Sequence, residues 1–428
     1  MQQSFLRYAF PSKLTEYQYM RKSENSEVNR YQTLIESLLE QVERLPKPVR
    51  RKVQRELEKL LEFVRDRRPP RFMLVGRRGA GKSTLINAIY GAPVREVGSV
   101  NSQTGEAQWL EYDRNGKTLE MLDTRGVQEG SDPAENDVSS SAVESLKSAI
   151  QEKCPDVIIF IIKAKEVDAA VDGDIQVLNK IHSFISKEKS RNLGIVGVVT
   201  QCDELDPPFI QRLPTDNKEK NSNIDSAVST LERHLKSSQL ISKYIVDVIP
   251  TAAFVRFRAD GSMDEKHDYR WNIEHLVGLL LDELPKKAKL DFARLAEIRR
   301  FQRKIAYRIV DLCSLAAGGI GSQPIPLADL PFITSLQATM VLTVAYISGR
   351  ELSMTAAKEY LAAVGGTTGA AFALREGVRA VAKFAPGWGN AISGGVAAVG
   401  TEVIGRGAVG YFIDKKSVEE VREEFESA

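Results

Sequence analysis

A glycine-rich run that follows a short apolar segment is the part of the chain best suited to chemistry. Residues 72–75 read Phe-Met-Leu-Val, residues 76–83 fit Gly-x-x-x-x-Gly-Lys-Ser, and residues 85–89 continue with the apolar spacing of a helix. A strand, a glycine-rich loop and a helix in this order are the context that a phosphate-binding loop requires. The backbone N–H groups of the loop and the positive end of the helix would then hold the phosphates of a nucleoside triphosphate.

Individual positions of this loop predict separate roles. Lys82 can reach the β- and γ-phosphates, which makes it a predicted catalytic residue, and the Ser83 hydroxyl can ligate Mg²⁺. A chance glycine turn is the alternative, but it leaves the strand before the loop and the helix after it unexplained. The residues predicted to line the nucleotide here are Gly76, Arg77, Gly79, Ala80, Gly81, Lys82, Ser83 and Thr84.

The next two segments resemble the phosphate-sensing motifs of GTPases. Residues 118–126 form a strand that ends in Asp-x-x-Gly, so Asp123 would hold Mg²⁺ through water and the N–H of Gly126 would contact the γ-phosphate. The alternative for Asp123 is a turn aspartate at a strand end. Residues 100–107 are polar and without periodicity, as a mobile first switch should be, and Thr104 is the predicted catalytic threonine that closes onto Mg²⁺. Ser102 competes for that role, and an ordinary loop threonine is the alternative. The predicted metal ligands are Ser83, Thr104 and Asp123.

The segment Thr-Gln-Cys-Asp at residues 200–203 follows an apolar strand at residues 193–199. It resembles the Asn/Thr-Lys-x-Asp motif of GTPases, whose aspartate accepts hydrogen bonds from the ring N–H and the exocyclic amine of guanine. Adenine offers no matching pair of donors, so Asp203 would reject it. Gln201 stands where the motif has a lysine, which weakens the clamp on the base, and a plain loop aspartate is the alternative for Asp203.

A second base-contacting turn is predicted at the end of a strand at residues 244–250. Thr251-Ala-Ala253 stands where GTPases carry a guanine-contacting Ser-Ala turn. The predicted cofactors are therefore GTP or GDP with Mg²⁺, and a guanine nucleotide is the predicted partner. The residues predicted to bind nucleotide beyond the phosphate loop are Gly126, Thr200, Gln201, Asp203, Thr251, Ala252 and Ala253.

The order of these elements resembles the Era/TrmE-like branch of translation-factor-class GTPases, over about residues 71–258. The resemblance implies an α/β fold, a P-loop GTPase domain built on a doubly wound, mostly parallel sheet, with nucleotide across the carboxyl ends of the strands. The residue patterns agree, because residues 156–162 and 193–199 are continuous apolar runs of the kind buried on both faces. Helical spacing occurs at residues 142–150, 175–185, 224–235 and 273–281, and Asn115-Gly116 predicts a hairpin that joins residues 108–112 to 118–122.

Three departures from the family pattern bear on mechanism. Val127 stands where small GTPases place a glutamine that orients the attacking water. Gly79 stands where potassium-activated members place an asparagine. Arg77 and Arg78 could extend over the phosphates, in cis or across a dimer, and Arg78 is the predicted catalytic arginine. The alternative is that both guanidinium groups face solvent or pair with nearby acids. We expect slow GTP hydrolysis without a partner or a dimer.

Helical flanks are predicted on both sides of the nucleotide-binding region and would together form an α-helical domain. The expected limits are an N-terminal helical segment at 1–69, a GTPase domain at 70–258 and a C-terminal helical domain at 259–428. Two amphipathic helices are expected at residues 28–42 and 49–64, the second ending by Arg68 because Pro69-Pro70 disfavours further helix. Residues 290–309 predict one basic amphipathic helix, either contacting anionic lipid or nucleic acid or forming a solvated face.

The C-terminal region is rich in small and apolar residues. Apolar segments lie at 332–347, 356–364, 369–384 and 391–413, but Gln337, Glu402 and Arg406 interrupt two of them. A soluble bundle and a membrane-embedded one both fit this pattern. Residues 284–413 resemble a bacterial C-terminal module of unknown function that is fused to Era-like GTPases. The overall layout is also similar to the immunity-related GTPases, which dimerise through their nucleotide sites and act at membranes.

Composition indicates the class of protein and its cellular compartment. The chain has 428 residues, a formal net charge of +2 and 43% hydrophobic residues, which is ordinary for a folded or peripherally bound protein. Three cysteines without paired spacing and a start without an apolar signal core predict a cytoplasmic protein, with peripheral membrane contact as an expected addition.

Three functions follow from these patterns. The first is a GTP-binding and GTP-hydrolysing switch whose helical domain changes partner or membrane contacts with nucleotide state, as a nucleotide-dependent homodimer. The alternative is an RNA- or ribosome-associated Era-like GTPase, although the basic stretch has few of the aromatic residues on which RNA bases stack. The third is a nucleotide-gated structural protein with negligible catalysis, because Val127 cannot position water.

Overall fold

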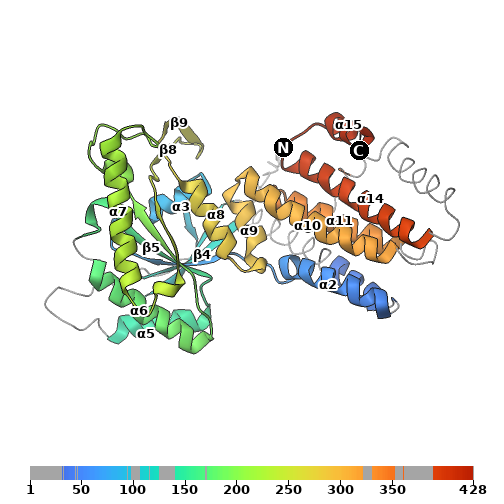
Figure 1. Cartoon of the computed structure of the whole chain (residues 1–428), viewed down its shortest axis with the longest axis horizontal. Helices are drawn as coiled ribbons and strands as arrows, with labels where there is room; N and C mark the ends of the chain where they lie inside the picture. The colour runs from blue at the N-terminus through green and yellow to red at the C-terminus, as the bar shows by residue number, and fades with distance from the viewer. Residues whose placement is uncertain are drawn as a thin grey trace, which may run out of the picture. The chain divides into compact units, whose positions relative to one another are not determined.

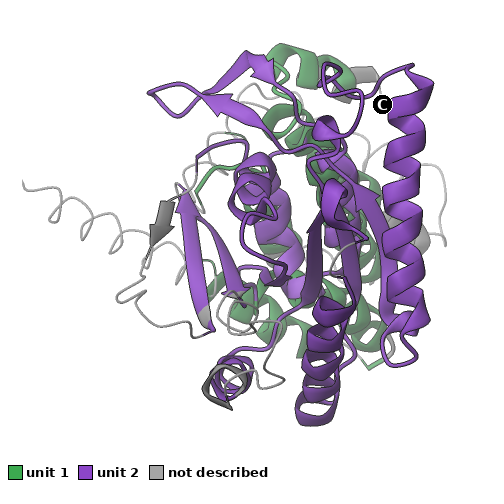
Figure 2. Cartoon of the chain, turned by 90° about the vertical axis from the view of Figure 1, so that its left-hand side faces the viewer, with its two compact units in different colours: residues 1–66, 299–428 green, residues 67–298 purple. Residues whose placement is uncertain are grey.

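The computed structural model describes residues 31, 33–43, 45, 47–93, 95–97, 107–114, 116–124, 140–168, 171–321, 330–351, 360 and 389–427. The chain divides into two compact units, coloured separately in Figure 2: a sheet unit, residues 67–298, and a helical unit, residues 1–66 and 299–428. The sheet unit extends past the predicted boundary at residue 258, because two further helices pack on its sheet.

The sheet unit is built on seven strands, and its parallel part carries the predicted motifs. From one edge to the other the strands are β2 (Arg95–Val97), β3 (Gln108–Arg114), β4 (Lys117–Asp123), β1 (Arg71–Val75), β5 (Val157–Lys163), β6 (Ile195–Thr200) and β7 (Ile245–Pro250). Strands β4, β1, β5, β6 and β7 are parallel, and β2 and β3 are antiparallel to their neighbours. The predicted mostly parallel sheet is confirmed.

Helices cover both faces of this sheet, as the doubly wound prediction requires. On one face α3 (Lys82–Tyr90), α8 (Ile273–Glu283) and α9 (Lys286–Ala296) pack together, and the rings of Phe72 and Phe292 meet edge to face at 5.3 Å. On the other face lie α5 (Ser140–Glu152), α6 (Val171–Lys189) and α7 (Lys218–Ser237), as Figure 1 shows. Their buried side chains share a core with Met73, Phe160 and other strand residues. Apolar strands lie in the middle because both of their faces are buried.

The predicted hairpin between β3 and β4 is confirmed, and a second hairpin was missed. Arg114 pairs with Lys117 across a two-residue turn, in which Gly116 has a φ of +70°, the left-handed conformation that such turns need. Strands β8 (Val255–Phe257) and β9 (Met263–Asp268) form the missed hairpin. Strand β9 reads Met-Asp-Glu-Lys-His-Asp, so it has no alternation of apolar residues that could have predicted a strand.

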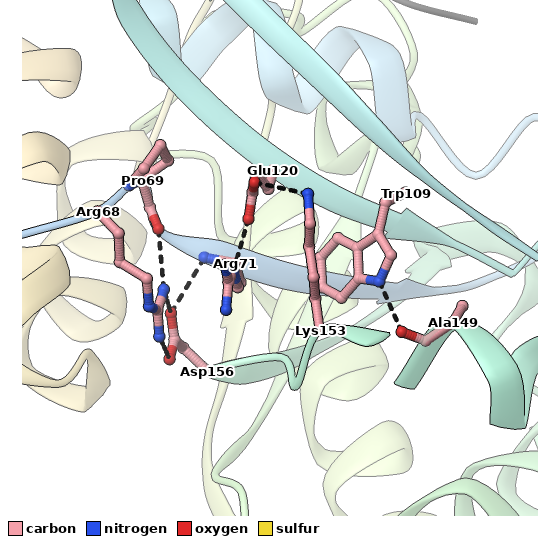
Figure 3. A network of polar contacts seen from close by, with 8 residues as sticks. All are labelled: Arg68, Pro69, Arg71, Trp109, Glu120, Ala149, Lys153 and Asp156. Atoms are coloured by element: carbon pink, nitrogen blue, oxygen red, sulfur yellow. Dashed lines mark hydrogen bonds and ion pairs between the residues drawn. The ribbon is translucent and has the colours of Figure 1, made fainter. Parts of the chain in front are cut away.

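A polar network closes the amino ends of β1 and β5, away from the strand ends that carry the predicted nucleotide motifs (Figure 3). The Asp156 carboxylate is fully buried and accepts two hydrogen bonds from the Arg68 guanidinium, at 2.8 and 2.6 Å, and one from the Arg71 backbone N–H at 3.1 Å. The Glu120 carboxylate on β4 lies between Arg71, at 2.5 Å, and Lys153, at 2.9 Å. Side chains from distant parts of the chain thereby fix the point at which the chain enters the sheet.

We predict that Glu120→Gln lowers the stability of the sheet unit in a pH-dependent way. Burial raises the pKa of Glu120, but hydrogen bonds from Lys153 and Arg71 outweigh it and hold the pKa below its usual range. Ionised Glu120 therefore stabilises the fold above its unfolded-state pKa of about 4.3, and this stabilisation disappears as pH falls through the lower folded-state pKa. The expected loss at pH 7 is about 1–3 kcal/mol.

Urea unfolding followed by tryptophan fluorescence, at pH 7 and at steps below pH 4.3, measures this loss. Glu111→Gln is the matched control, because Glu111 pairs with Glu120 across the hairpin but is exposed. A loss that is the same at every pH, or equal in the control, would contradict the assignment.

The predicted single helix at residues 290–309 is wrong, because the chain breaks at Glu297. Helix α9 ends there with a left-handed φ of +53°, and α10 (Arg299–Gly321) starts two residues later. The break coincides with the border between the two units. The sequence does not reveal this break, because apolar spacing continues across residues 290–309 and this stretch contains no glycine or proline.

The helical unit contains residues 33–43, α2 (Lys47–Val64), α10, α11 (Leu330–Ile347), α14 (Gly389–Phe412) and α15 (Val418–Ser427). The predicted helix that ends before Pro69-Pro70 is confirmed as α2. Helices α10, α11 and α14 pack on one another, as Figure 1 shows. A Cβ at Gly405 would lie 2.6 Å from the methyl groups of Val310, so glycine allows α14 to approach α10 closely.

Polar residues inside the apolar helices have partners within this unit. Gln337 on α11 donates a hydrogen bond to the Thr401 hydroxyl on α14 at 3.1 Å, and Arg406 pairs with Glu402 at 2.7 Å one turn away. Among the helices that the structure describes, none has the length and hydropathy needed to cross a membrane. The predicted apolar segments at 356–364 and 369–384 lie outside the described residues, apart from Tyr360.

Candidate nucleotide-binding site

The predicted nucleotide motifs come together at the carboxyl ends of the parallel strands. In the sheet register, Leu74 lies opposite Asp123, Lys163 opposite Thr200, and Val199 opposite Pro250. Strand β1 is the point at which the strand order reverses, because the chain first builds the β2–β4 side and then adds β5 beyond β1. Ligands of open α/β sheets bind at such a reversal.

The glycines of the phosphate loop are each required by its geometry. A Cβ at Gly76 would clash with the carbonyl oxygen of Ile161, so only glycine lets the loop leave β1 beside β5. Gly79 and Gly81 have φ values of +79° and +87°, which side chains other than hydrogen disfavour. Gly81 is also the N-cap of α3, so the loop opens directly onto a helix N-terminus. This is a cradle for an anion, and it fits the phosphates of a nucleotide.

The polar side chains of the loop have donors and acceptors suited to phosphate and Mg²⁺. The Lys82 ammonium donates hydrogen bonds to the carbonyl oxygens of Gly76 and Arg77, the second at 2.9 Å, so it lies within the loop. Ser83 and Thr84 are exposed at the start of α3. Asp123 is the last residue of β4, next to β1. Thr104 and Gly126, the other predicted residues of the phosphate side, lie outside the described residues.

The two loop arginines differ in their surroundings. The Arg77 Nε donates to the Asp174 carboxylate on α6 at 3.0 Å, so the alternative of pairing with an acid is the one observed. Burial raises the pKa of Asp174, although Arg77 and Lys82 both lower it. Arg78 is exposed on the loop. Arg77 is exposed as well, so the ion pair with Asp174 is what distinguishes the two arginines.

The end of β6 ties the predicted base-reading segment to the phosphate loop. The Thr200 hydroxyl donates to the carbonyl oxygens of Ala80 at 2.8 Å and Ile162 at 3.2 Å. Gln201 has a left-handed φ of +57°, and its Nε2 donates to the Gly79 carbonyl oxygen at 3.4 Å. The glutamine thus contacts the phosphate loop from the position where the sequence departs from the lysine of the motif.

The remaining base-side residues lie beside Thr200. The short 3₁₀ helix η2 (Cys202–Glu204) contains Asp203, and the Cys202 N–H donates to the Thr251 carbonyl oxygen at 3.2 Å. Thr251, Ala252 and Ala253 are buried. Burial raises the pKa of Asp203, and the nearby Lys220 and Lys165 partly offset this. The structure brings the predicted residues 200–203 and 251–253 together at one end of the sheet.

Sequence reasoning missed Lys220, a buried lysine in the first turn of α7. Its ammonium donates to the carbonyl oxygens of Asp203, in the predicted base-reading segment, and of Leu205, two residues after it. No sequence pattern separates this lysine from the many solvated lysines of the chain.

Comparison with known families agrees with this geometry. A family model described as a 50S ribosome-binding GTPase matches residues 71–199, from the first residue of β1 into β6. The chain carries a P-loop GTPase domain. The resemblance of residues 284–413 to a bacterial C-terminal module stays a prediction.

The curated relatives of the GTPase domain share it at low identity. GTPase Der of Phocaeicola vulgatus is 31% identical over 142 residues, which cover 33% of this chain and 30% of the relative. GTPase Der of Lacticaseibacillus casei is 30% identical over 136 residues, which cover 32% of this chain and 28% of the relative. The chain thus spans less than a third of the length of these relatives.

Two solved structures are similar to this chain at low sequence identity. Toc33 from Arabidopsis thaliana in complex with Mg²⁺ and GMPPNP has a TM-score of 0.33 and 15% identity, and covers 57% of this chain and 95% of its own. Era in complex with MgGDPNP and nucleotides 1506–1542 of 16S ribosomal RNA has a TM-score of 0.30 and 19% identity. It covers 61% of this chain and 70% of its own.

Proposed function

We propose that this protein is a GTP-binding and GTP-hydrolysing switch whose helical unit changes partner or membrane contacts with nucleotide state. The observation that carries the proposal is the convergence of three segments on one end of the sheet: the phosphate loop after β1, residues 200–203 after β6 and residues 251–253 after β7. The first suits phosphates and the other two suit a guanine base, which is the division of a GTPase site.

Different residues would stabilise the phosphate charge and recognise the guanine base. Lys82 and the loop N–H groups would stabilise negative charge on the β- and γ-phosphates, and Asp203 would accept two hydrogen bonds from guanine. Bound Mg²⁺, held by Ser83 with Thr104 and Asp123, would supply a further positive charge at the phosphates. Val127 cannot orient water, so we expect slow turnover by the chain alone.

The proposal predicts that Arg78→Ala slows GTP hydrolysis by about tenfold or more, which is about 1.4 kcal/mol of transition-state stabilisation. The guanidinium would stabilise charge that develops only in the transition state, in cis or from the second molecule of a homodimer, so nucleotide affinity should change little. Turnover per molecule should also rise with protein concentration. Phosphate release at several protein concentrations measures both effects.

Lys187→Ala is the control for this variant. It removes a positive charge at an exposed position of α6, outside the predicted site, and should leave the rate within about twofold. A concentration-independent rate that survives Arg78→Ala would remove the support for an arginine acting across a dimer.

Lipid contact is supported by the exposed basic face of α10. Ile305, Ala306 and Ile309 are buried in the helical unit, and the opposite face of the helix carries exposed basic residues. One of them, Arg303, pairs with Asp414 at 2.5 Å. Each Lys or Arg near an anionic membrane contributes about 1 kcal/mol to binding. We propose a cytoplasmic protein with peripheral membrane contact through this face, which comprises Arg299, Arg300, Arg303, Lys304 and Arg308.

Flotation with vesicles of phosphatidylcholine, with and without phosphatidylserine, tests this contact in the presence of GTP, GDP or no nucleotide. We expect binding only to anionic vesicles and a dependence on nucleotide. The double variant Arg299→Glu and Arg308→Glu should lose binding. Lys187→Glu with Lys236→Glu, on exposed positions of the sheet unit, is the charge-matched control. Equal flotation of both double variants would contradict the role of α10.

A second candidate function is an RNA- or ribosome-associated GTPase. It is favoured by the matched family model, which is described as a 50S ribosome-binding GTPase. Co-sedimentation with 50S subunits, in GTP and in GDP, tests it. Nucleotide-dependent sedimentation without flotation would favour this candidate over lipid contact.

A further inference from the structure

The loop that follows the base-reading residue is held by a buried ammonium group. Lys220 is fully buried in the first turn of α7. Its Nζ donates hydrogen bonds to the carbonyl oxygens of Asp203, at 2.7 Å, of Leu205, and of Pro207, at 3.5 Å. An ammonium has three donors and no acceptor, so these three backbone carbonyls match its hydrogen-bonding capacity.

Lys220 is itself fixed by the start of α7. The Asn217 side chain is the N-cap of this helix and accepts a hydrogen bond from the Lys220 backbone N–H at 2.8 Å. One turn further, the Asn223 side chain donates to the Asp206 carbonyl oxygen at 3.0 Å. The first turns of α7 thus donate to four carbonyl groups between residues 203 and 207, so hydrogen bonds join the loop to the helix.

The other side of Asp203 is held by the sheet. The Cys202 N–H donates to the Thr251 carbonyl oxygen at 3.2 Å, and the Thr251 N–H donates to the Val199 carbonyl oxygen at 2.7 Å. Asp203 therefore lies between an anchor at the end of β6 and an anchor on α7. A carboxylate that must accept hydrogen bonds from two parallel N–H groups needs this support, because binding groups must be held within about 0.5 Å of their productive geometry.

The chemistry of the contact also explains why the residue is a lysine. A neutral side chain such as methionine fills the same volume but removes the donor to the carbonyls of Asp203 and Leu205, whereas the Pro207 carbonyl would keep its hydrogen bond from the Ile210 N–H, at 3.1 Å. Burial lowers the pKa of Lys220, and the nearby Asp203, Cys202 and Asp206 partly offset this decrease. The carbonyl dipoles replace the water that the ammonium has lost.

We propose that Lys220 is a positioning residue for guanine recognition, whose ammonium holds the backbone of residues 203–207 so that the Asp203 carboxylate faces the base. This inference rests on the proposed function, because it assumes that the site binds GTP. Lys220 touches the main chain of the base reader and acts on the nucleotide only through it.

Lys220→Met tests the proposal through the ratio of two affinities. Inosine triphosphate (ITP) lacks the exocyclic amine from which Asp203 would accept a hydrogen bond. The parent protein should therefore bind GTP more tightly than ITP. In Lys220→Met we expect this preference to fall by about tenfold. A merely structural role would lower both affinities together and leave the ratio unchanged. Calorimetry with GTP and ITP on the full chain measures both constants.

Lys236→Met is the matched control, because Lys236 lies on the same helix and pairs with Glu232 at the surface. Its ratio should equal that of the parent. An unchanged ratio in Lys220→Met would overturn the proposal and leave the proposed function intact. A parent chain that binds no guanine nucleotide would overturn the proposed function, and this inference with it.

Three further substitutions keep the test decisive if Lys220→Met does not fold. Asn223→Ala removes only the contact to the Asp206 carbonyl and should lower the ratio by about two- to threefold. A double-mutant cycle combines Lys220→Arg with Asp203→Ala. Lys220→Arg alone should reduce the ratio of GTP affinity to ITP affinity. It should cause no further reduction when Asp203→Ala is already present, because both residues act through one carboxylate. Additive effects would overturn the proposal.

Discussion

Lys82→Ala should reduce the affinity for GTP by a factor on the order of 10²–10⁴. The Lys82 ammonium already lies within the phosphate loop, where it donates to the carbonyl oxygens of Gly76 and Arg77. Charge-assisted hydrogen bonds to phosphate are each worth about 1.5–3 kcal/mol, and the substitution would remove two of them. The loss should be larger for GTP than for GDP, because the γ-phosphate contact exists only in GTP.

Calorimetry with both nucleotides tests this prediction, and thermal unfolding checks that the variant is folded. Lys180→Ala, at an exposed position of α6, is the control and should bind GTP like the parent. Tight GTP binding by a folded Lys82→Ala variant would contradict the assignment of residues 76–83 as the phosphate loop.

Asp203→Asn should change the preferred base from guanine to xanthine. The carboxylate can accept from both the ring N–H and the exocyclic amine of guanine, whereas an amide presents one donor to that pair. Xanthine has a carbonyl oxygen in place of the amine and therefore complements the amide. The affinity for GTP should fall by a factor on the order of 100, and xanthosine triphosphate should bind the variant better than it binds the parent.

Competition between GTP and xanthosine triphosphate measures the exchange of preference. Glu204→Gln is the neighbouring control, since it changes charge in the same 3₁₀ helix at an exposed residue. If the variant gains no affinity for xanthosine triphosphate, Asp203 does not read the base.

Those features of the GTPase domain that depend on neighbouring residues could be predicted from the sequence. Gly79 and Gly81 adopt conformations that only glycine adopts easily, so the loop is encoded by residue type and spacing. Strand β5 is a run of apolar residues because both of its faces are buried, and the hairpin turn at Gly116 is encoded locally. The end of α2 was likewise predicted from neighbouring residues, because Pro69-Pro70 disfavours further helix.

Other features depend on which distant side chains meet, and no local pattern reveals that. Arg77 was a candidate for the phosphates until the structure placed Asp174, far along the chain, beside its guanidinium. The break at Glu297 follows from packing of α9 on the sheet, since apolar spacing continues through it. The buried Arg68–Asp156 pair likewise joins segments that are distant in the sequence.

The expectation of a guanine nucleotide comes from the sequence alone, because phosphate binding and guanine recognition require particular residue types at fixed local spacing. The contacts that support the proposed site depend on the packing of distant segments. Lys220 resembles any surface lysine until α7 folds against the loop after Asp203, where loss of water makes three backbone carbonyls its partners. Burial gives such a contact its strength, and burial is a property of the whole fold.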